Sequence, residues 1–387
     1  MKSAFLEEQT TKRELADFIL GARRLSMDVK CFEFENVFAE HQGSSEAVLF
    51  NSGGSANLAM LQALRNLGRL QAGARVGFSS LTWSTNTMPI IQMGMTPIAL
   101  DVTPDTLNVM SHDILRRLED VQLDALFLTN VLGFAVDLDV IRDLCNERGI
   151  LLIEDNCESL GTELPAGRTG NFGIAGSFSF FVAHHMSTIE GGMVCTSDPE
   201  LAEMLRIVRA NGWDRNLTSA QQFKLRKRHN VKNEFEAKYT FYDLGYNLRP
   251  TEITGFLGLM QMRYLTQNVQ QRQSNYLRLE SVIAENPDLL TLCHDHLTVL
   301  SSFAWPVITR TPELRDHYAA QFSGAGVEIR PLIAGNIQRQ PFYAKYVEKH
   351  YDVPGADQLH DCGFYCGNYP ELTEADIETL TSCLRQF

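Results

Sequence analysis

Short apolar runs alternate with amphipathic stretches between about residues 45 and 200. The runs at 46–50, 74–78, 96–100, 125–129 and 150–154 are hydrophobic at successive positions, as expected for buried strands of a mostly parallel sheet. Between them, apolar residues at three- and four-residue spacing predict helices over 56–67, 112–119 and 138–148. This alternation predicts a doubly wound α/β domain with helices on both faces of the sheet. Ligands of such domains bind at the carboxyl ends of the strands.

The rest of the chain predicts a second, smaller unit. A helix is expected over 199–212, and the polar, basic stretch 214–240 is expected to form an excursion over the surface. A long helix from 251 to about 284 would lead into a smaller α+β region. We therefore divide the chain into an N-terminal segment at 1–25, a large domain at 26–250, and a bridging helix with a small C-terminal domain at 251–387.

The composition narrows the class of protein. The 387 residues include 34 Lys and Arg against 47 Asp and Glu, a net charge of −13 that argues against nucleic acid or an anionic membrane surface as a partner. No apolar run approaches the ~20 residues of a membrane helix, and the start of the chain lacks the apolar core of a signal peptide. The eight cysteines are scattered, with only Cys362 and Cys366 close together, which favours reduced thiols. We expect an acidic cytoplasmic protein.

Three segments place chemically useful side chains next to predicted strand ends. The turn NSGGSAN at 51–57 would open a helix with free backbone N–H groups that suit a phosphate, although such turns are often only turns. Asp155 and Glu158 follow a strand, where a carboxylate could pair with a protonated ring nitrogen or cap the next helix. Trp83 follows another strand, where its ring could stack on a planar ligand or belong to the core. None of these segments identifies a site by itself.

Two histidines lie in a fourth segment, 176–196. An apolar strand is predicted to run into His184 and His185, and Glu-Gly-Gly at 190–192 leads into the next strand. No acidic or cysteine residue lies at helical spacing to complete a metal site, so no metal is predicted. Because adjacent strand residues point to opposite faces, only one of the two histidines can face a given pocket. A structural role is the simpler interpretation of His185, which leaves His184 as the candidate for chemistry.

In their order, these segments resemble the sugar aminotransferase family that uses pyridoxal phosphate, the DegT/DnrJ/EryC/StrS group, whose fold is that of aspartate aminotransferase. The family pattern resembles S-F-x-x-x-K-x-x-x-x-x-E-G-G, in which the lysine forms a Schiff base with the cofactor. Here Ser179 begins the pattern, Glu190 begins its Glu-Gly-Gly end, and His184 stands at the lysine position. No lysine occurs between Lys30 and Lys224. This exchange is typical of one branch, the 3-dehydratases of nucleotide-linked 4-keto-6-deoxysugars. The similarity also includes the segments 154–159, 211–217, 245–252, 326–331 and 366–372.

The resemblance implies a type I fold of the pyridoxal-phosphate-dependent transferases, with the cofactor in the large domain. It assigns cofactor contacts to a set of residues at strand ends: the phosphate to Gly53, Gly54 and Ser179, the ring face to Trp83, the ring nitrogen to Asp155, and the ring hydroxyl region to Glu158. Asn247 would reach in from the second subunit of a homodimer with shared sites. Arg249 and Arg330 would bind the nucleotide sugar or the carboxylate of glutamate.

Two positions depart from the pattern of the branch. Gly54 stands where a serine is usual, so only its backbone could serve the phosphate. Asn211 stands where a histidine is usual, which leaves the role of that histidine unfilled or changed.

The implied activity is removal of the C3 hydroxyl from a nucleotide-linked 4-keto-6-deoxyhexose, with GDP-4-keto-6-deoxy-D-mannose as the expected substrate. Without the lysine, the cofactor would rest as pyridoxamine 5'-phosphate, held noncovalently, and its amine would condense with the C4 ketone. His184, with an ordinary pKa of ~6.5, would remove a proton from the cofactor and help the hydroxyl leave. L-glutamate would regenerate the cofactor, and the product would be a 3,6-dideoxysugar of the kind found in lipopolysaccharide O-antigens.

Several alternatives stay open. An ordinary nucleotide-sugar aminotransferase is disfavoured by the lysine-free stretch, and a catalytically inactive binding or regulatory relative is disfavoured by the retained cofactor residues. A 3-dehydratase acting on a CDP- or dTDP-sugar would share the same motifs. One such branch uses an iron–sulfur cluster, which needs clustered cysteines that this sequence lacks. The basic run KLRKRH at 224–229 is either a solvated surface or a site for the substrate diphosphate.

Overall fold

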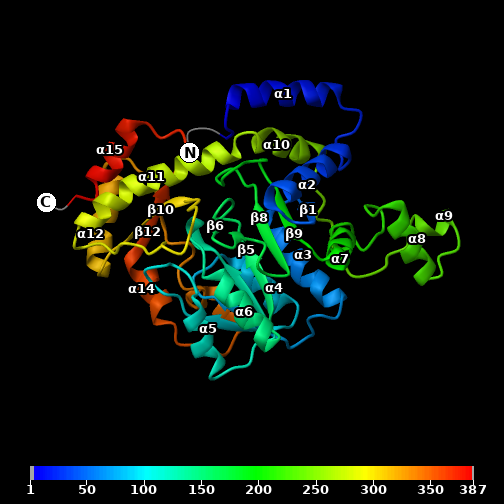
Figure 1. The fold of residues 1–387 in the computed structure, drawn as a ribbon, viewed down its shortest axis with the longest axis horizontal. Helices are drawn as coiled ribbons and strands as arrows, with labels where there is room; N and C mark the ends of the chain where they lie inside the picture. Colours follow the sequence, from blue (N-terminus) through cyan, green and yellow to red (C-terminus); the bar gives the residue numbers. More distant parts are fainter. Residues whose placement is uncertain (1–3, 386–387) are drawn as a thin grey trace.

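A seven-stranded sheet forms the centre of the computed structural model, which describes residues 4–385 (Figure 1). The strands lie in the order β1-β9-β8-β5-β4-β2-β3. Strand β9 is antiparallel to both of its neighbours, whereas the other neighbouring pairs are parallel. The strands are β1 (Glu46–Phe50), β2 (Arg75–Ser79), β3 (Thr96–Leu100), β4 (Ala125–Thr129), β5 (Leu151–Asp155), β8 (Ala175–Ser179) and β9 (Gly192–Thr196). All five predicted strands are present, each within one residue of its expected position.

Both faces of this sheet are buried. Alternate residues of β1 enter two different hydrophobic cores, Val48 and Phe50 one of them and Ala47 and Leu49 the other. Because successive side chains of a strand point to opposite faces, the two cores cover the two faces of the sheet. The predicted mostly parallel α/β architecture is therefore confirmed.

Two of the helices around the central sheet begin at side-chain caps. Ser52 caps α3 by accepting a hydrogen bond from Ser55 N, and Asp198 caps α7 in the same way, with Pro199 at its first position. The helices around the sheet are α2 (Val29–Gln42), α3 (Gly53–Asn66), α4 (Ser84–Gln92), α5 (Ser111–Leu118), α6 (Leu138–Arg148) and α7 (Pro199–Arg209), with the short η1 (Val131–Gly133). A small hairpin of β6 (Glu163–Leu164) and β7 (Gly167–Arg168) follows β5. Helix α1 (Glu8–Gly21) lies along α10 (Figure 1).

The long helix predicted from 251 to about 284 is two helices, α10 (Glu252–Met262) and α11 (Leu265–Glu285). No Pro or Gly marks the break. Tyr264, with φ −108° and ψ −7°, is the residue before α11, and Leu265 at the start of that helix is buried. Helix α10 packs on α2, and α11 packs on α15 (Glu374–Ser382) (Figure 1).

The C-terminal part has the expected α+β composition. Its sheet has the order β10-β12-β11, with both pairs antiparallel. The elements are β10 (Ala304–Ile308), α12 (Pro312–Gly324), β11 (Ile329–Pro331), η2 (Ile337–Arg339), α13 (Pro341–Tyr346), α14 (Pro354–Cys362), β12 (Gly363–Gly367) and α15 (Glu374–Ser382). The division of the chain at 25 and 250 stays a prediction.

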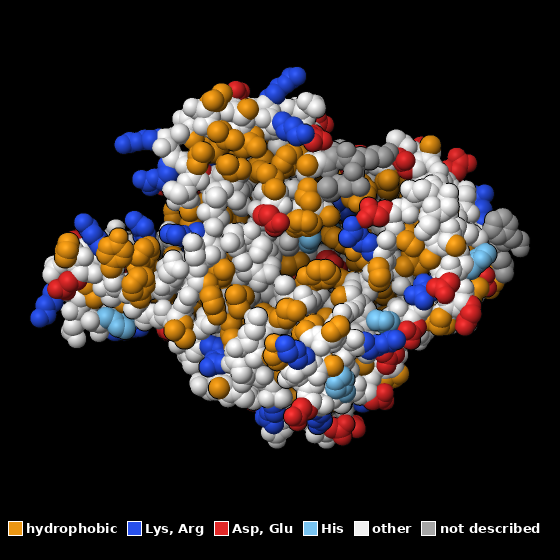
Figure 2. All heavy atoms as spheres, turned by 180° about the vertical axis from the view of Figure 1, so that it is seen from behind, with side chains coloured by type: hydrophobic (Ala, Val, Ile, Leu, Met, Phe, Trp, Pro, Cys, Tyr) orange, Lys and Arg blue, Asp and Glu red, His pale blue; other side chains and the backbone are white. Residues whose placement is uncertain are grey.

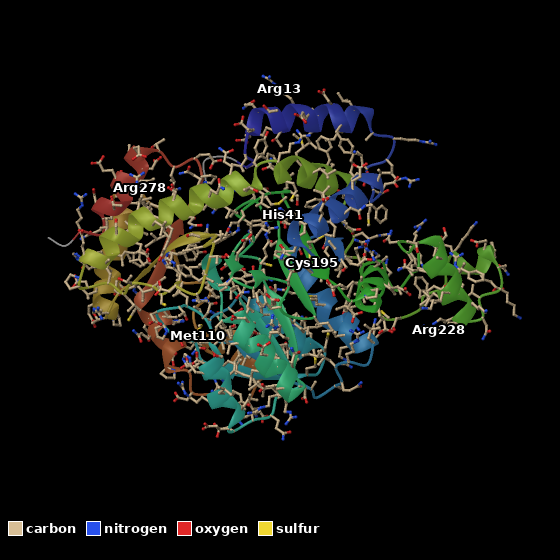
Figure 3. All side chains as sticks on the ribbon, viewed as in Figure 1. Arg13, His41, Met110, Cys195, Arg228 and Arg278 are labelled. Carbon is tan, nitrogen blue, oxygen red and sulfur yellow. The ribbon has the colours of Figure 1, made fainter. Side chains whose placement is uncertain are left out.

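The stretch 214–240 forms an arm that projects from the body, with α8 (Ser219–Arg228) and α9 (Glu234–Ala237) at its end (Figure 1). The basic run 224–229 lies mostly on α8, and Arg228 is at its C-terminal end (Figure 3). Arg226 is tied within the arm by ion pairs to Asp214 and Glu234. Among the helices of residues 4–385, none is long and apolar enough to cross a membrane.

Candidate active site

The turn after β1 brings the first residues of α3 against the end of β8. A Cβ atom added to Gly53 would lie 2.7 Å from Ser179 Cβ and 3.1 Å from Cys157 Sγ, so a residue with a side chain does not fit there. The first N–H groups of a helix have no partner within it and carry the positive end of the helix dipole. The turn therefore places the N-terminal end of α3 next to Ser179. That this helix end holds a phosphate stays a prediction.

Asp155 is the last residue of β5, and its carboxylate is enclosed by N–H donors. Its Oδ2 atom accepts hydrogen bonds from Asn57 Nδ2 at 2.8 Å and Asn86 Nδ2 at 2.9 Å, and its Oδ1 atom accepts one from Cys157 N at 2.9 Å. Asn57 is itself oriented by Ser177, whose Oγ atom donates to Asn57 Oδ1 at 2.6 Å. These contacts fix the direction of the carboxylate and stabilise its negative charge.

Trp83 stands at the start of α4, three residues before Asn86. Its side chain is 56% exposed, whereas Asn86 is fully buried. A large ring left open beside a buried polar cluster can stack on a planar ligand. Thr85, in the first turn of α4, faces Gly54 of α3: a Cβ atom on Gly54 would lie 3.0 Å from Thr85 Cγ2, so a serine at that position would press on Thr85.

Glu158 follows Asp155 and carries a perturbed carboxyl group. Its Oε2 atom accepts a hydrogen bond from Leu132 N at 2.9 Å. Burial raises the pKa of Glu158 to about 8, and the charge of Asp155 adds to this effect. Burial, with the charge of Glu158 second, raises the pKa of Tyr365 to about 12. Arg330 is the register partner of Tyr365 and forms an ion pair with Glu328, so the structure brings Arg330 to the Glu158 side of the site.

The segment from 180 to 191 is an irregular loop, not the continuation of a strand. The sequence predicted that strand alternation would turn His184 and His185 to opposite faces. Because the segment is not a strand, that reason is wrong. The two rings nevertheless have different surroundings. His185 is 1% exposed and its Nε2 atom bonds to the backbone oxygen of Ser301 at 2.9 Å, which requires the proton on Nε2. His185 thus has the structural role expected of it.

Two hydrogen bonds connect His184 to Ser179 by way of Phe181. Phe181 N donates to Ser179 Oγ at 3.4 Å, and His184 N donates to Phe181 O at 2.9 Å. The His184 ring meets the Phe303 ring at 5.1 Å between centroids, edge to face. Its Nδ1 atom is buried and has no hydrogen-bond partner in the described part of the chain, which leaves Nε2 as the ring nitrogen for proton exchange with a ligand.

The pKa expected for His184 from its sequence alone, near 6.5, is wrong. Burial lowers the pKa of His184 to about 4, and the nearby charge of Arg272 contributes. The imidazole is therefore neutral at physiological pH and able to accept a proton.

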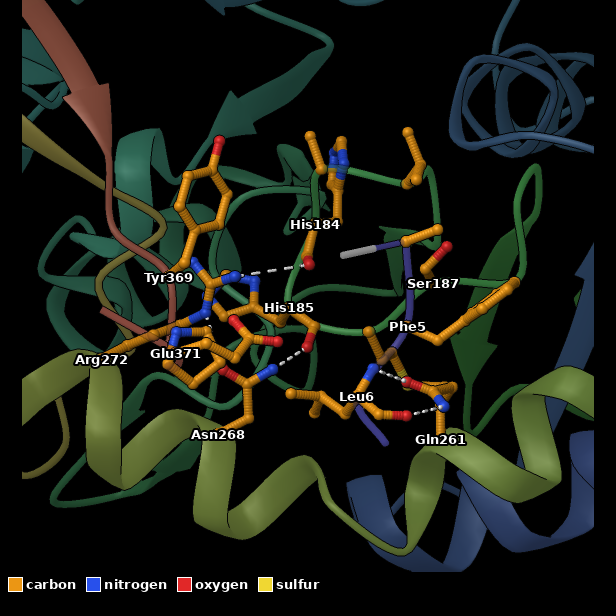
Figure 4. A pocket seen from close by; sticks show the side chains of 15 residues that line it. Phe5, Leu6, His184, His185, Ser187, Gln261, Asn268, Arg272, Tyr369 and Glu371 are labelled. Carbon is orange, nitrogen blue, oxygen red and sulfur yellow. Dashed lines mark hydrogen bonds between the residues drawn. The ribbon is translucent and has the colours of Figure 1, made fainter. Parts of the chain in front are cut away.

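Sequence reasoning missed the residues that surround this loop and the Asp155 carboxylate. Arg272 and Asn268 on α11 contact the backbone of the loop (Figure 4). Both lie on the otherwise apolar face of α11 that includes Leu265 and Leu279. Polar residues four positions apart on the buried face of a helix are a signal from which the sequence could have identified Asn268 and Arg272 as candidates for a buried polar cluster. Asn57 gave a similar signal on the buried face of α3.

Asn247 and Arg249 do not join this cluster within one chain. They line a separate cavity of about 690 Å³ together with Arg24, Phe32 and Arg215. Within it, Arg249 Nε donates to Asn247 Oδ1 at 3.1 Å. The neighbouring Asn211 adopts a left-handed backbone conformation with φ 59°, and its N–H group donates to Tyr246 O.

The assembled side chains form a set that can hold a phosphorylated aromatic ring and move protons beside it. The set includes an anion-binding helix end, an enclosed carboxylate, an open indole ring, a carboxyl group protonated near neutral pH and a neutral imidazole. Among residues 4–385, no group of three or more His, Cys, Asp or Glu side chains is arranged to hold a metal ion.

Comparison with known proteins agrees with this arrangement. The family model of the DegT/DnrJ/EryC1/StrS aminotransferases matches residues 7–385. The chain is 30% identical over 373 residues to a GDP-4-keto-6-deoxy-D-mannose 3-dehydratase of Escherichia coli O55:H7, covering 95% of each protein. The fold superposes on a histidine-to-asparagine mutant of GDP-4-keto-6-deoxymannose 3-dehydratase with bound GDP-perosamine, with a TM-score of 0.90, 29% identity and 99% coverage of both chains. It superposes equally on a GDP-4-keto-6-deoxymannose 3-dehydratase with a trapped PLP–glutamate geminal diamine, with a TM-score of 0.88, 30% identity and 97% coverage of both chains.

Proposed function

The chain belongs to the DegT/DnrJ/EryC1/StrS aminotransferase family, and from this we propose that it is a pyridoxal-phosphate-dependent 3-dehydratase of a nucleotide-linked 4-keto-6-deoxyhexose. The observation that carries the proposal is His184 at the lysine position of the family pattern. No lysine occurs from residue 31 to 223, which includes every strand of the central sheet and the loops between them. The chain therefore offers no Schiff-base lysine in this region, and an imidazole stands in its place.

The residues present fit the cofactor. Gly53 leaves a space that a side chain would fill, at a helix end that favours a phosphate. Asn57 and Asn86 hold the Asp155 carboxylate in one direction, which suits a protonated ring nitrogen. We propose that Gly53, Gly54 and Ser179 hold the phosphate and that Trp83 stacks on the ring.

When bound, the cofactor supplies an amine for the C4 ketone of the sugar and an electron sink for the charge that develops during dehydration. His184 Nε2, unprotonated at neutral pH because of its low pKa, accepts a proton and returns it to the departing C3 hydroxyl, which leaves as water. Glu158 keeps its proton near neutral pH and can donate a hydrogen bond to an oxygen on the cofactor ring. Arg249 and Arg330 are proposed to bind the diphosphate of the substrate or the carboxylate of glutamate.

Over one cycle, the nucleotide sugar and L-glutamate become the 3-deoxy sugar, 2-oxoglutarate and ammonia. We propose GDP-4-keto-6-deoxy-D-mannose as the substrate, because a relative that is 30% identical over 373 residues carries that activity in its name. We also propose the cytoplasm as the place of action. The test is to incubate the purified protein with GDP-, CDP- and dTDP-linked 4-keto-6-deoxysugars and glutamate, and to follow ammonia and the sugar by NMR. Release of ammonia with a CH₂ group at C3 supports a dehydratase. An amino group retained at C4 would show an aminotransferase instead.

We further propose that the protein is a homodimer with shared sites. Asn247 and Arg249 lie apart from the other site residues of their own chain, in a cavity that includes Phe32. Figure 2 shows an apolar patch in the upper part of the molecule. Helices α1 and α2 and the segment between them carry exposed apolar side chains, which are Ile19, Leu20, Leu25, Val29, Phe32 and Val37.

Complementation tests the shared sites directly. Asn247→Ala and His184→Asn should each be inactive alone, and mixing the two after subunit exchange should restore activity, because one site of each mixed dimer is intact. A sedimenting monomer with full activity, or no recovery in mixed dimers, would contradict this proposal.

A further inference from the structure

Arg272 on α11 is a buried cation behind the loop that carries His184. It is 2% exposed and lies with His184, His185, Tyr369 and Glu371 around a cavity of about 30 Å³ (Figure 4). A guanidinium group in such a position must satisfy its N–H donors from the protein, because burying a charge without partners is costly.

The hydrogen bonds of Arg272 to described residues end on amide and carbonyl oxygens. Nη1 donates to Phe303 O at 2.8 Å and to Asn368 O at 2.5 Å, and Nε donates to Asn268 Oδ1 at 2.8 Å. Nη2 donates to His184 O at the longer distance of 3.5 Å. One side chain thus joins α11 to the His184 loop, the segment before β10 and the segment after β12.

Two of these bonds reach the histidines through a second residue. Because Asn268 Oδ1 accepts from Arg272, its Nδ2 atom is turned toward His185 O, to which it donates (Figure 4). The Phe303 carbonyl is held by Arg272, and the Phe303 ring packs on the rings of His184 at 5.1 Å and His185 at 5.9 Å. The irregular loop has no strand partners between 180 and 191, so these contacts, with the bond between His185 Nε2 and Ser301 O, hold it in place.

We propose that Arg272 is a positioning residue for His184: its guanidinium group fixes the loop from behind and so sets the place of the imidazole in proton transfer. This inference deepens the proposed dehydratase function and rests on it for its kinetic part.

The charge of Arg272 also helps to keep the His184 imidazole neutral. The titratable groups that face His184 are Arg272 from α11, His185 from its own loop, and Tyr369 and Glu371 from the segment after β12. After burial, the charge of Arg272 is the next contribution that lowers the pKa of His184. Positioning and charge therefore both keep the imidazole ready as a neutral base.

The test compares Arg272→Gln, Arg272→Lys and the control Arg278→Gln. Arg278 lies on the same helix but forms a surface ion pair with Glu374 at 2.7 Å, away from the loop (Figure 3). In the full-length protein labelled with ¹³C-histidine, the His184 signal is identified by its absence in His184→Asn. Its chemical shift is followed from pH 8 to pH 4, together with kcat and KM for the nucleotide sugar and cofactor absorbance.

We expect the His184 signal of the parent and of Arg272→Lys to move toward the protonated position only near the lower end of this range. In Arg272→Gln the same movement should begin at a higher pH, because the charge of Arg272 is removed while burial, the larger contribution, remains. A misplaced base reduces kcat by up to about 10²-fold, so Arg272→Gln should lose about that factor at unchanged cofactor binding. Arg272→Lys should lose about 10-fold, because an ammonium group keeps the charge but not the planar fork. Arg278→Gln should behave as the parent.

Two results would overturn the proposal. One is a folded Arg272→Gln whose kcat stays within about twofold of the parent. The other is an Arg272→Gln whose His184 signal moves at the same pH as that of the parent. If Arg272→Gln does not fold, Asn268→Ala decides: a loss in kcat of about 10-fold supports positioning, and parental kcat refutes it. If the parent converts no nucleotide sugar at all, the proposed function has failed, and the NMR titration still tests Arg272.

Discussion

Asp155 and Glu154 offer a matched pair for testing the cofactor assignment. They are adjacent on β5 and point to opposite faces, both are buried, and each accepts three N–H bonds. Glu154 binds the backbone of Gly170, Phe172 and Gly173 on the far face, whereas Asp155 faces the proposed cofactor site. Asp155→Asn and Glu154→Gln therefore make the same chemical change at a functional and at a structural carboxylate.

Asp155→Asn should leave a folded protein. An amide has one acceptor oxygen, so at least one of the three N–H donors faces an NH₂ group and loses its bond. An unsatisfied buried donor costs about 1–3 kcal/mol, which for a chain of this size lowers Tm by about 1–4 °C. Activity should fall much further. A charge pair at contact distance in a site with an effective dielectric constant of ~20 is worth about 4 kcal/mol, or about 10³ in rate.

Glu154→Gln has two opposing effects on stability. The substitution destabilises the fold because the new amide NH₂ group faces a backbone N–H donor. It stabilises the fold because it removes a buried carboxyl group, whose pKa burial raises to about 7. The change in unfolding free energy at pH 8 should stay within about 2 kcal/mol, with parental turnover. Thermal unfolding and ammonia release measured on both variants decide the matter. Near-normal turnover of Asp155→Asn, or equal loss of activity in both variants, would refute the assignment of Asp155 to the ring nitrogen.

Three further outcomes are expected. His184→Asn should still bind pyridoxamine phosphate, seen by absorbance, while its turnover falls ~10²–10⁴-fold, and His185→Asn should lose stability but little activity; the reverse result would mean that the two roles are exchanged. Gly53→Ala places a Cβ atom 2.7 Å from a β8 side chain and should weaken cofactor retention at least about 10-fold in equilibrium dialysis, whereas Gly21→Ala, which meets nothing within 4 Å, should retain the cofactor as the parent does. The folded-state pKa of Glu154, about 7, lies above its ordinary 4.5, so its contribution to stability is full below pH 4.5 and is lost as the pH rises to 7, a change of about 3 kcal/mol. Urea unfolding from pH 5 to 8 should show this loss in the parent and not in Glu154→Gln, and parallel curves for the two would contradict it.

Much of the fold and of the candidate site was predictable because the signals are local. A buried strand reads as a short apolar run whatever packs on it, so all five predicted strands are present within one residue. The phosphate turn, Trp83, Asp155 and the His184 loop each lie in one contiguous motif, and their order along the chain was enough to indicate the family and its cofactor. The exchange of lysine for histidine at position 184 is likewise visible in the sequence alone.

What the tertiary structure decided depends on residues far apart in the chain. Asn57 and Asn86 reach Asp155 from two helices, and Arg272 reaches the His184 loop from 88 residues away, so no local pattern shows either contact. The low pKa of His184 follows from the same burial and the same distant charge. The break between α10 and α11 falls at Arg263 and Tyr264, where no Pro or Gly marks it in the sequence. Hydrophobic periodicity acts between neighbouring residues and can be read along the chain, whereas hydrogen-bond partners, burial and local charge exist only once distant segments have packed together.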